Sequence, residues 1–255
     1  MRAKKQTYDA VYSLGTNCAA SDYLRRMGLR KGAGPFDWIR AEDPRCPFET
    51  ILSGFNNFLQ KEDLVLADFQ DPQKIRCIYH NKRSRYTFFH DFACELTLEE
   101  QFKQVSDKYN RRKERFLKDI SSKKKILLVW YAEWNGFLKQ EELKEYADKL
   151  NAFFGREIDF LFIQYNSEQK EDINYYSLAE YADCYILGNL AEHPRVEGNL
   201  FWDEKRITPL FKSISVKRSI GERIKSLKPV WVRIRAAFIW NKTKRHQFVE
   251  SRLGK

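Results

Sequence analysis

The sequence predicts an α/β fold, with a mostly parallel sheet flanked by helices, a β-hairpin insertion and a basic amphipathic C-terminal helix. Residues 126–131 form a continuously apolar run, which is typical of a strand covered on both faces. Strand-like and helix-like segments alternate after this run, which indicates parallel strands joined by helices. We find no low-complexity linker, and we expect one α/β domain over residues 1–216 with a separate tail over residues 217–255.

The first predicted elements are a strand and a helix that meet at a glycine turn. Residues 8–14 are rich in β-formers and end at Gly15, so we expect a strand there. The next two residues are suitable helix caps, apolar side chains then recur at helical spacing over 18–27, and Gly28 supplies a stop. Cys18 is therefore predicted at the start of the first helix.

The later elements follow from the same patterns. Apolar residues that recur at three and four predict an amphipathic helix over 48–59. Two β-rich runs, 75–79 and 86–89, flank a polar turn and predict a hairpin. The other expected elements are a long charged helix over 96–120, a strand over 126–131, a helix over 140–153, a strand over 158–165, a helix near 175–181 and a strand over 184–187.

Cysteine usage and hydropathy limit the class of protein. The five cysteines are an odd number and include no C-x-x-C pair, which argues against a disulfide framework and against a zinc site. We therefore expect no metal and no cofactor. No stretch reaches the ~20 apolar residues of a membrane span, and the N-terminus has no apolar segment of the secretory kind. These features predict a cytoplasmic protein.

Nearly all of the net charge lies at the C-terminus. Residues 217–255 hold 12 Lys and Arg against 2 Asp and Glu, a balance of +10, whereas the other 216 residues hold 34 against 33, a balance of +1. Apolar residues recur in this tail at helical spacing, and a basic amphipathic helix suits an anionic membrane surface. We expect the tail to bind the inner face of the cell membrane, or alternatively to dock on the domain. The neutral body argues against a nucleic-acid partner.

Cys18 is the first candidate for chemistry. The start of a helix carries roughly half a positive charge and unpaired N–H groups. A thiol at this place is expected to ionise more readily than a free one. The alternative is a buried Cys that acts as a small hydrophobic side chain.

His90 is the second candidate, in the run Phe-Phe-His-Asp-Phe at 88–92. A histidine beside an acid can serve as the general base for a thiol, with the carboxylate orienting the imidazole. Asp91 is adjacent in sequence, and in a regular strand it points away from His90. Asp37 is an equally good orienting acid. The alternative is a structural histidine at the end of a strand.

These residues belong to a set of motifs that resembles a known family. The motifs are Ser-Leu-Gly-Thr-Asn-Cys at 13–18, Leu-Arg-Arg-Met-Gly-Leu-Arg at 24–30, Gly-Pro-Phe-Asp-Trp at 34–38, His-Asp-Phe at 90–92, Tyr-Asn-Arg-Arg at 109–112 and Arg-Phe at 115–116. Together they resemble a bacterial domain of unknown function labelled "putative papain-like cysteine peptidase", over about residues 8–205. The resemblance implies that Cys18 is a nucleophile and that His90 is its partner. Asp37, Asp91 and Asn135 all stay open as a third member.

The resemblance does not extend to the expected architecture. A sheet strand that leads directly into the cysteine turn, and the alternation after residue 125, resemble a three-layer α/β hydrolase or a nucleotide-binding fold more than papain. The sequence therefore predicts nucleophilic thiol chemistry on an acyl-type substrate, whether or not that substrate is a peptide.

The substrate side of the site is predicted from polar and aromatic residues. Gly15 and Asn17 lie in a turn that suits an anion, and Trp38 follows the second motif. Arg111 and Arg112 are expected to meet an unknown substrate that is anionic or glycan-linked, although solvated ion pairs are the alternative. A function of a different class is a non-catalytic or sugar-phosphate-handling module in bacterial surface-polysaccharide assembly, held at the membrane by the tail.

Overall fold

In a computed structural model of the chain we describe residues 6–67, 75–133, 136–193 and 203–219. The predicted C-terminal helix therefore lies outside the described residues from 220 onward. The described elements belong to one unit, which ends at Val216. They are β1 (Gln6–Tyr8), β2 (Ala10–Ser13), α1 (Cys18–Arg26), β3 (Ile39–Ala41), α2 (Cys46–Leu52), a 3₁₀ turn (Lys61–Asp63), β4 (Leu64–Leu66), β5 (Arg76–Asn81), β6 (Tyr86–Ala93), α3 (Leu98–Ser122), β7 (Ile126–Ala132), α4 (Gln140–Phe154), β8 (Asp159–Tyr165), β9 (Ile173–Ala179), β10 (Ala182–Leu187), α5 (Glu204–Phe211) and β11 (Ile214–Val216).

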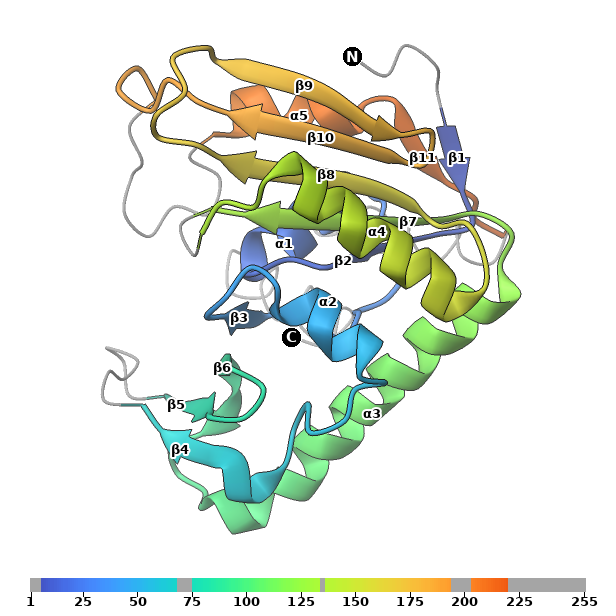
Figure 1. The fold of residues 1–255 in the computed structure, drawn as a ribbon. Helices are drawn as coiled ribbons and strands as arrows, with labels where there is room; N and C mark the ends of the chain where they lie inside the picture. Colours follow the sequence, from blue (N-terminus) through green and yellow to red (C-terminus); the bar gives the residue numbers. More distant parts are fainter. Residues whose placement is uncertain (1–5, 68–74, 134–135, 194–202, 220–255) are drawn as a thin grey trace, which may run out of the picture. The chain divides into compact units, whose positions relative to one another are not determined.

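A five-stranded sheet forms the centre of this unit (Figure 1). Its strand order is β2-β7-β8-β10-β9, and the first four strands are parallel. β9 pairs antiparallel with β10 at the edge. All seven residues of β7 are buried, as expected for a central strand covered on both faces. The predicted α/β fold with a mostly parallel sheet is confirmed.

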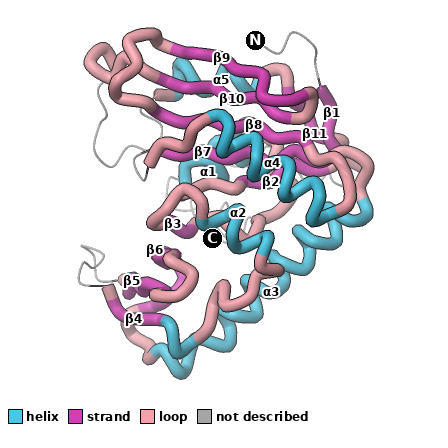
Figure 2. The backbone as a smooth tube through the Cα atoms, viewed as in Figure 1, coloured by secondary structure: helices cyan, strands magenta, loops and turns pink. Residues whose placement is uncertain are grey.

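Helices cover both faces of this sheet (Figure 2). Each face has its own hydrophobic core. Leu128 and Trp130 of β7 pack with apolar residues of α2, α3 and α4. Leu127 and Val129, which point the other way along the same strand, pack with α1 and α5. The three-layer arrangement that the alternating pattern predicts is therefore present. No helix within the described segments is long and apolar enough to span a bilayer.

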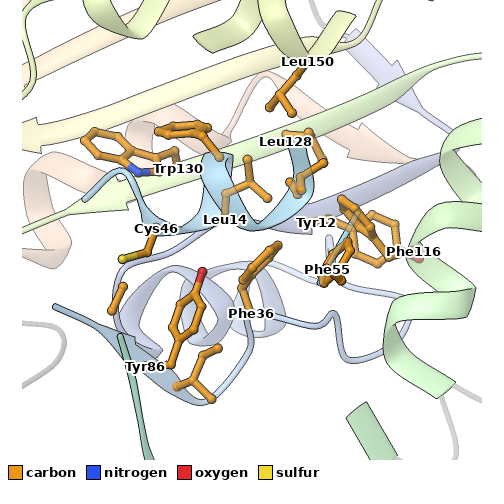
Figure 3. Packing of buried hydrophobic residues seen from close by; sticks show 14 of the residues in the cluster. Tyr12, Leu14, Phe36, Cys46, Phe55, Tyr86, Phe116, Leu128, Trp130 and Leu150 are labelled. Atoms are coloured by element: carbon orange, nitrogen blue, oxygen red, sulfur yellow. The ribbon is translucent and has the colours of Figure 1, made fainter. Parts of the chain in front are cut away.

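Aromatic residues tie the turn after α1 to the first of these cores (Figure 3). The Phe36 ring lies 5.7 Å from that of Phe55 and 6.3 Å from that of Phe116. Phe116 in turn meets Tyr12 of β2 edge to face at 5.1 Å. Offset and edge-to-face pairs of this kind are the favoured arrangements of aromatic rings. Phe36 therefore fixes the turn that contains two predicted site residues.

A second, antiparallel sheet has the order β3-β6-β5-β4 and contains the predicted hairpin as β5 and β6. Cys77 pairs with Phe92 and Tyr79 pairs with Phe88, so one residue of β5 faces three of β6. This irregularity is a β-bulge, and His90 is the middle one of the three residues. Bulges re-aim side chains and are frequent beside active sites. The bulge therefore removes the strict alternation on which the sequence argument about Asp91 depended.

Two predicted helices differ from the structure. The helix near 175–181 is wrong, because this segment is the edge strand β9. Tyr175 pairs with Tyr185 of β10, and their rings are 5.2 Å apart, so cross-strand packing outweighs the helical spacing. The helix over 48–59 is present only as α2, which ends at Leu52. Gly54, Phe55 and Asn57 follow with positive φ, which a helix cannot accommodate.

Candidate active site

The turn before α1 places Cys18 at the carboxyl edge of the central sheet. The Leu14 N–H donates to the Val129 carbonyl at 2.7 Å, and the Thr16 N–H donates to the Tyr131 carbonyl at 3.2 Å. These bonds hold the turn to β7 after β2 has ended. Ligands in open α/β sheets bind at this edge of the strands. The predicted position of Cys18 as first residue of the first helix is confirmed.

Asn17 holds the start of α1 through both polar atoms of its side-chain amide. Its Oδ1 accepts from the Ala19 N–H at 2.9 Å, which is an N-cap bond. Its Nδ2 donates to Oε2 of Glu133 at 3.1 Å. Asn17 is buried, and both polar groups of its side chain are engaged in these contacts. We therefore regard it as a residue that positions Cys18.

The same turn has no space for a side chain at Gly15. A Cβ there would lie 2.8 Å from the Ala20 Cβ and 2.9 Å from the Asn17 carbonyl oxygen. The Gly15 N–H also donates to Ser13 Oγ at 2.9 Å, a further bond within this turn. Gly15 is required for the close approach of the turn to α1.

The structure brings Cys18 and His90 together, as the sequence predicted. Cys18 Sγ lies 3.8 Å from His90 Nε2, within the range of a weak hydrogen bond to sulfur. The two residues are 72 positions apart and come from different elements, the start of α1 and the bulge of β6. Cys18 is half-buried and His90 is exposed, so the pair is open to a reactant on the imidazole side.

Trp38 lies beside this pair in an uncommon backbone conformation. Its φ of 71° is in the left-handed region, where a bulky residue is an outlier and costs of order 1–3 kcal/mol. The indole meets the His90 ring edge to face at 6.3 Å. The guanidinium groups of Arg25 and Arg30 lie 5.9 and 5.4 Å from the indole centre. Trp38, which the sequence predicted as a substrate-binding residue, therefore lies against His90.

Asp37 supports Trp38 and makes no hydrogen bond to His90. Its buried carboxylate accepts from Arg30 Nη1 at 2.8 Å and from the Gly34 N–H at 3.0 Å. Burial raises the pKa of the Asp37 carboxyl, and the Arg30 charge opposes this shift. Arg112 adds a bond from Nη1 to the Asp37 carbonyl oxygen at 3.4 Å. Asp37 and Arg112 therefore fasten the turn that presents Trp38.

Asp91 faces α3, and its two carboxylate oxygens are engaged there. One accepts from the Tyr109 hydroxyl at 2.8 Å, and the other contacts the Lys108 ammonium. Asp91, Lys108 and Arg111 also line a cavity of about 230 Å³. Arg111 therefore lies in this neighbouring cavity, and Arg112 lies with the Asp37 turn.

No orienting acid is hydrogen-bonded to His90 among the residues that the structure describes. Asp37 and Asp91 both have other partners. Asn135, the third residue that the sequence left open, lies outside the described residues. The described site is a cysteine–histidine dyad. Glu133 and Tyr109, which hold Asn17 and Asp91, were not predicted as site residues, although Glu133 directly follows the apolar strand β7.

The surroundings of Cys18 disfavour its thiolate. Burial, and then the charges of Asp91, Asp37 and Asp22, raise the pKa of the Cys18 thiol from 9.0 to about 12. This direction is opposite to the lowered pKa that the helix start alone predicts. Desolvation and three nearby carboxylates outweigh that effect. The resting thiol is therefore neutral and must lose its proton during the attack.

Removal of one of these charges is expected to make Cys18 more reactive. In Asp91→Asn the amide still accepts from Tyr109, but the negative charge that opposes the thiolate is lost. We expect a lower Cys18 pKa and a rise of roughly tenfold in its alkylation rate at a fixed pH, the effect of one pKa unit. Alkylation by iodoacetamide, followed by mass spectrometry across pH, measures this. Asp148→Asn on α4 is the control, and an unchanged Cys18 profile in Asp91→Asn would contradict the assignment.

Comparisons with known proteins agree with the motifs. Residues 9–145, 137 of the 255, match the model of a family described as "Putative papain-like cysteine peptidase", a domain of unknown function. An uncharacterized protein of Acanthamoeba polyphaga mimivirus is 27% identical over 175 residues, which are 62% of this chain and 78% of the viral protein. No solved structure matches the chain. The matched stretch contains Cys18, His90, Asp37 and Asp91, and the chain belongs to this family of putative papain-like cysteine peptidases.

Proposed function

We propose that this protein is a cysteine-dependent acyl hydrolase or acyltransferase in which Cys18 is the nucleophile and His90 is the general base. The contact of 3.8 Å between Cys18 Sγ and His90 Nε2 carries the proposal. A nucleophile within reach of a base is the arrangement that this chemistry needs. A packing cysteine in a non-catalytic module needs no such partner, so the contact favours the enzyme over that alternative.

The high pKa of Cys18 determines the order of proton transfer. The sulfur attacks the acyl carbon and forms a C–S bond while the thiol proton passes to His90 Nε2. The imidazolium then protonates the leaving group as its bond to the acyl carbon breaks, which leaves a thioester on Cys18. Water, or another acceptor, attacks this thioester, with His90 again taking the proton and returning it to sulfur.

The first turn of α1 is suited to the negative oxygen of the intermediate. The first four N–H groups of a helix have no partner within it. The N–H of Ala19 already donates a hydrogen bond to the Asn17 side chain. We therefore assign the N–H of Cys18 as the donor to the oxyanion. Backbone donors aimed at a developing charge contribute several kcal/mol to such reactions.

The substrate side is assigned to Trp38 and the basic groups around it. The indole and the imidazole meet at a right angle and form a corner beside Cys18. The guanidinium groups of Arg25 and Arg30 lie near the indole. An acyl group that carries an anionic or polar substituent fits this corner, whereas Gly15, Asn17 and Arg112 act by holding the surrounding turns.

Formation of a thioester on Cys18 tests the proposal. The protein is incubated with activated esters of differing acyl groups, and intact and digested samples are examined by mass spectrometry. We expect acyl transfer to Cys18 followed by turnover. Cys77 and Cys94, which are also half-buried thiols, serve as internal controls. Acylation of all three thiols at similar slow rates would reject a dedicated nucleophile.

We also propose that residues 217–255 bring the protein to anionic membrane surfaces. The support is the balance of +10 in this segment and the helical spacing of its apolar residues. Each Lys or Arg near such a surface contributes on the order of 1 kcal/mol. We expect the full chain to sediment with vesicles of phosphatidylserine and phosphatidylcholine, and far less with phosphatidylcholine alone or in high salt. Equal sedimentation after removal of residues 217–255 would contradict this role.

A further inference from the structure

A second cavity opens at the carboxyl edge of the central sheet, beyond the end of β7. Its volume is about 550 Å³, which is within the range of small-molecule sites. Glu133, Phe137, Tyr165, Asn166, Glu168 and Leu190 are among its lining residues. Glu133 directly follows β7, and Asn166 directly follows β8. The cavity therefore lies at the strand ends, where α/β proteins bind ligands.

The lining of the cavity has a definite chemical character. Glu133 and Glu168 supply two carboxylates, and no cationic side chain lines the cavity within the described residues. Phe137 is 38% exposed and, with Leu190, supplies apolar surface. We propose that this cavity binds the organic cation of a substrate, an ammonium or guanidinium group on an aliphatic stem.

Glu133 connects this cavity to the nucleophile. Its Oε2 accepts from Asn17 Nδ2 at 3.1 Å, and its Oε1 accepts from the Tyr131 hydroxyl at 3.3 Å. Asn17 caps α1 and directly precedes Cys18. One carboxylate thus lines the cavity and positions the turn that carries the thiol. The assignment of the cavity as a substrate subsite rests on the proposed function of Cys18, and it adds a cationic group to the acyl substrate.

The position of the cation also bears on the reaction. Asp91, Asp37 and Asp22 place negative charge near Cys18. A cation held by Glu133 and Glu168 offsets part of this negative charge, because Glu133 is bonded to Asn17, the residue before Cys18. A substrate that carries the cation therefore assists formation of the thiolate, whereas a neutral analogue does not.

Binding of n-pentylammonium tests the subsite without a need for catalysis. The full chain carrying Cys18→Ala is titrated with n-pentylammonium and, for comparison, with 1-pentanol, and binding is followed by NMR. We expect the ammonium to bind more tightly than the alcohol, and Glu133→Gln and Glu168→Gln each to weaken the ammonium by at least about threefold. Glu171→Gln, an exposed acid on the same loop that does not line the cavity, is the matched control.

The outcomes separate the subsite from the proposed function. Equal binding of ammonium and alcohol, or no loss in Glu168→Gln, would overturn the cation site. Glu133→Gln also disturbs the hydrogen bond between Glu133 and Asn17. Glu168→Gln leaves that bond in place, so it tests the cation site alone. Cation binding with no acylation of Cys18 would leave the subsite and reject the enzyme. Acylation of Cys18 with no cation binding would support the enzyme and reject the cation subsite.

Discussion

Replacement of His90 by Ala is expected to lower the rate of Cys18 acylation by on the order of 10²–10⁴-fold, the usual contribution of a general base. The effect is large because the Cys18 pKa is raised to about 12, so almost no thiolate exists without a proton acceptor. His90 Nε2 lies 3.8 Å from the sulfur and is placed to take that proton. Since His90 is exposed, its truncation is expected to leave the fold intact.

The matched control for this prediction is His80→Ala. His80 lies on β5, which pairs with β6, the strand that contains His90. Its Nδ1 is 3.3 Å from Thr87 Oγ1. Its Nε2 has a carboxylate partner, Glu42, at 3.3 Å, and within the described part of the chain it makes no hydrogen bond to Cys18. We expect wild-type acylation in His80→Ala, and complete loss of the thioester in Cys18→Ala. Equal rates in the wild type and in His90→Ala, measured on folded protein, would remove His90 from the mechanism.

The pH dependence separates the two roles that His90 can have. With a neutral thiol at rest, acylation in His90→Ala depends on ionisation of the Cys18 thiol and rises steadily toward high pH, whereas in the wild type His90 takes the thiol proton during the attack. A wild-type profile that matches the variant at every pH would indicate that the imidazole does not accept the proton.

The parts of the fold that the sequence could predict are those in which local pattern and burial agree. Strand β7 is apolar at every position and is buried at every position. Helix α3 begins after Thr97, its N-cap, whose side chain and that of Glu100 form a reciprocal capping box, so the start of the helix is locally encoded. The Cys18 turn is another such case, since its glycine, Gly15, and its cap, Asn17, lie only two positions apart in the chain.

The parts that could not be predicted depend on contacts between distant segments. Strand β9 is defined by its pairing with β10, which no pattern within residues 173–179 shows. His90 reaches Cys18 through a bulge, and its position depends on the register between β5 and β6. The same limit explains the thiol, because its burial and then three carboxylates from separate places in the chain raise its pKa. A helix start predicts the direction of one contribution to the pKa of Cys18. It does not predict the direction of the total shift in that pKa.

The second large effect is expected from Gly15→Ala, a single added methyl group in the turn before Cys18. The new Cβ would lie 2.8 Å from the Ala20 Cβ and 2.9 Å from a backbone oxygen, so the turn or α1 must move. Overpacking of this kind costs roughly 1–3 kcal/mol. We expect a loss of this size in the free energy of unfolding, measured by urea denaturation, together with slower acylation of Cys18.

Gly32→Ala is the matched control, because it adds the same methyl group in a turn of the same part of the chain. Its Cβ would meet only the flexible side chain of Arg115, at 3.4 Å. We expect a small change in unfolding free energy there and no change in Cys18 acylation. The Gly15 substitution acts on both properties because one backbone segment joins the sheet to the nucleophile: Leu14 and Thr16 are bonded to β7, and Cys18 begins α1. If Gly15→Ala unfolds like the wild type, the close packing of this turn is not what positions the thiol.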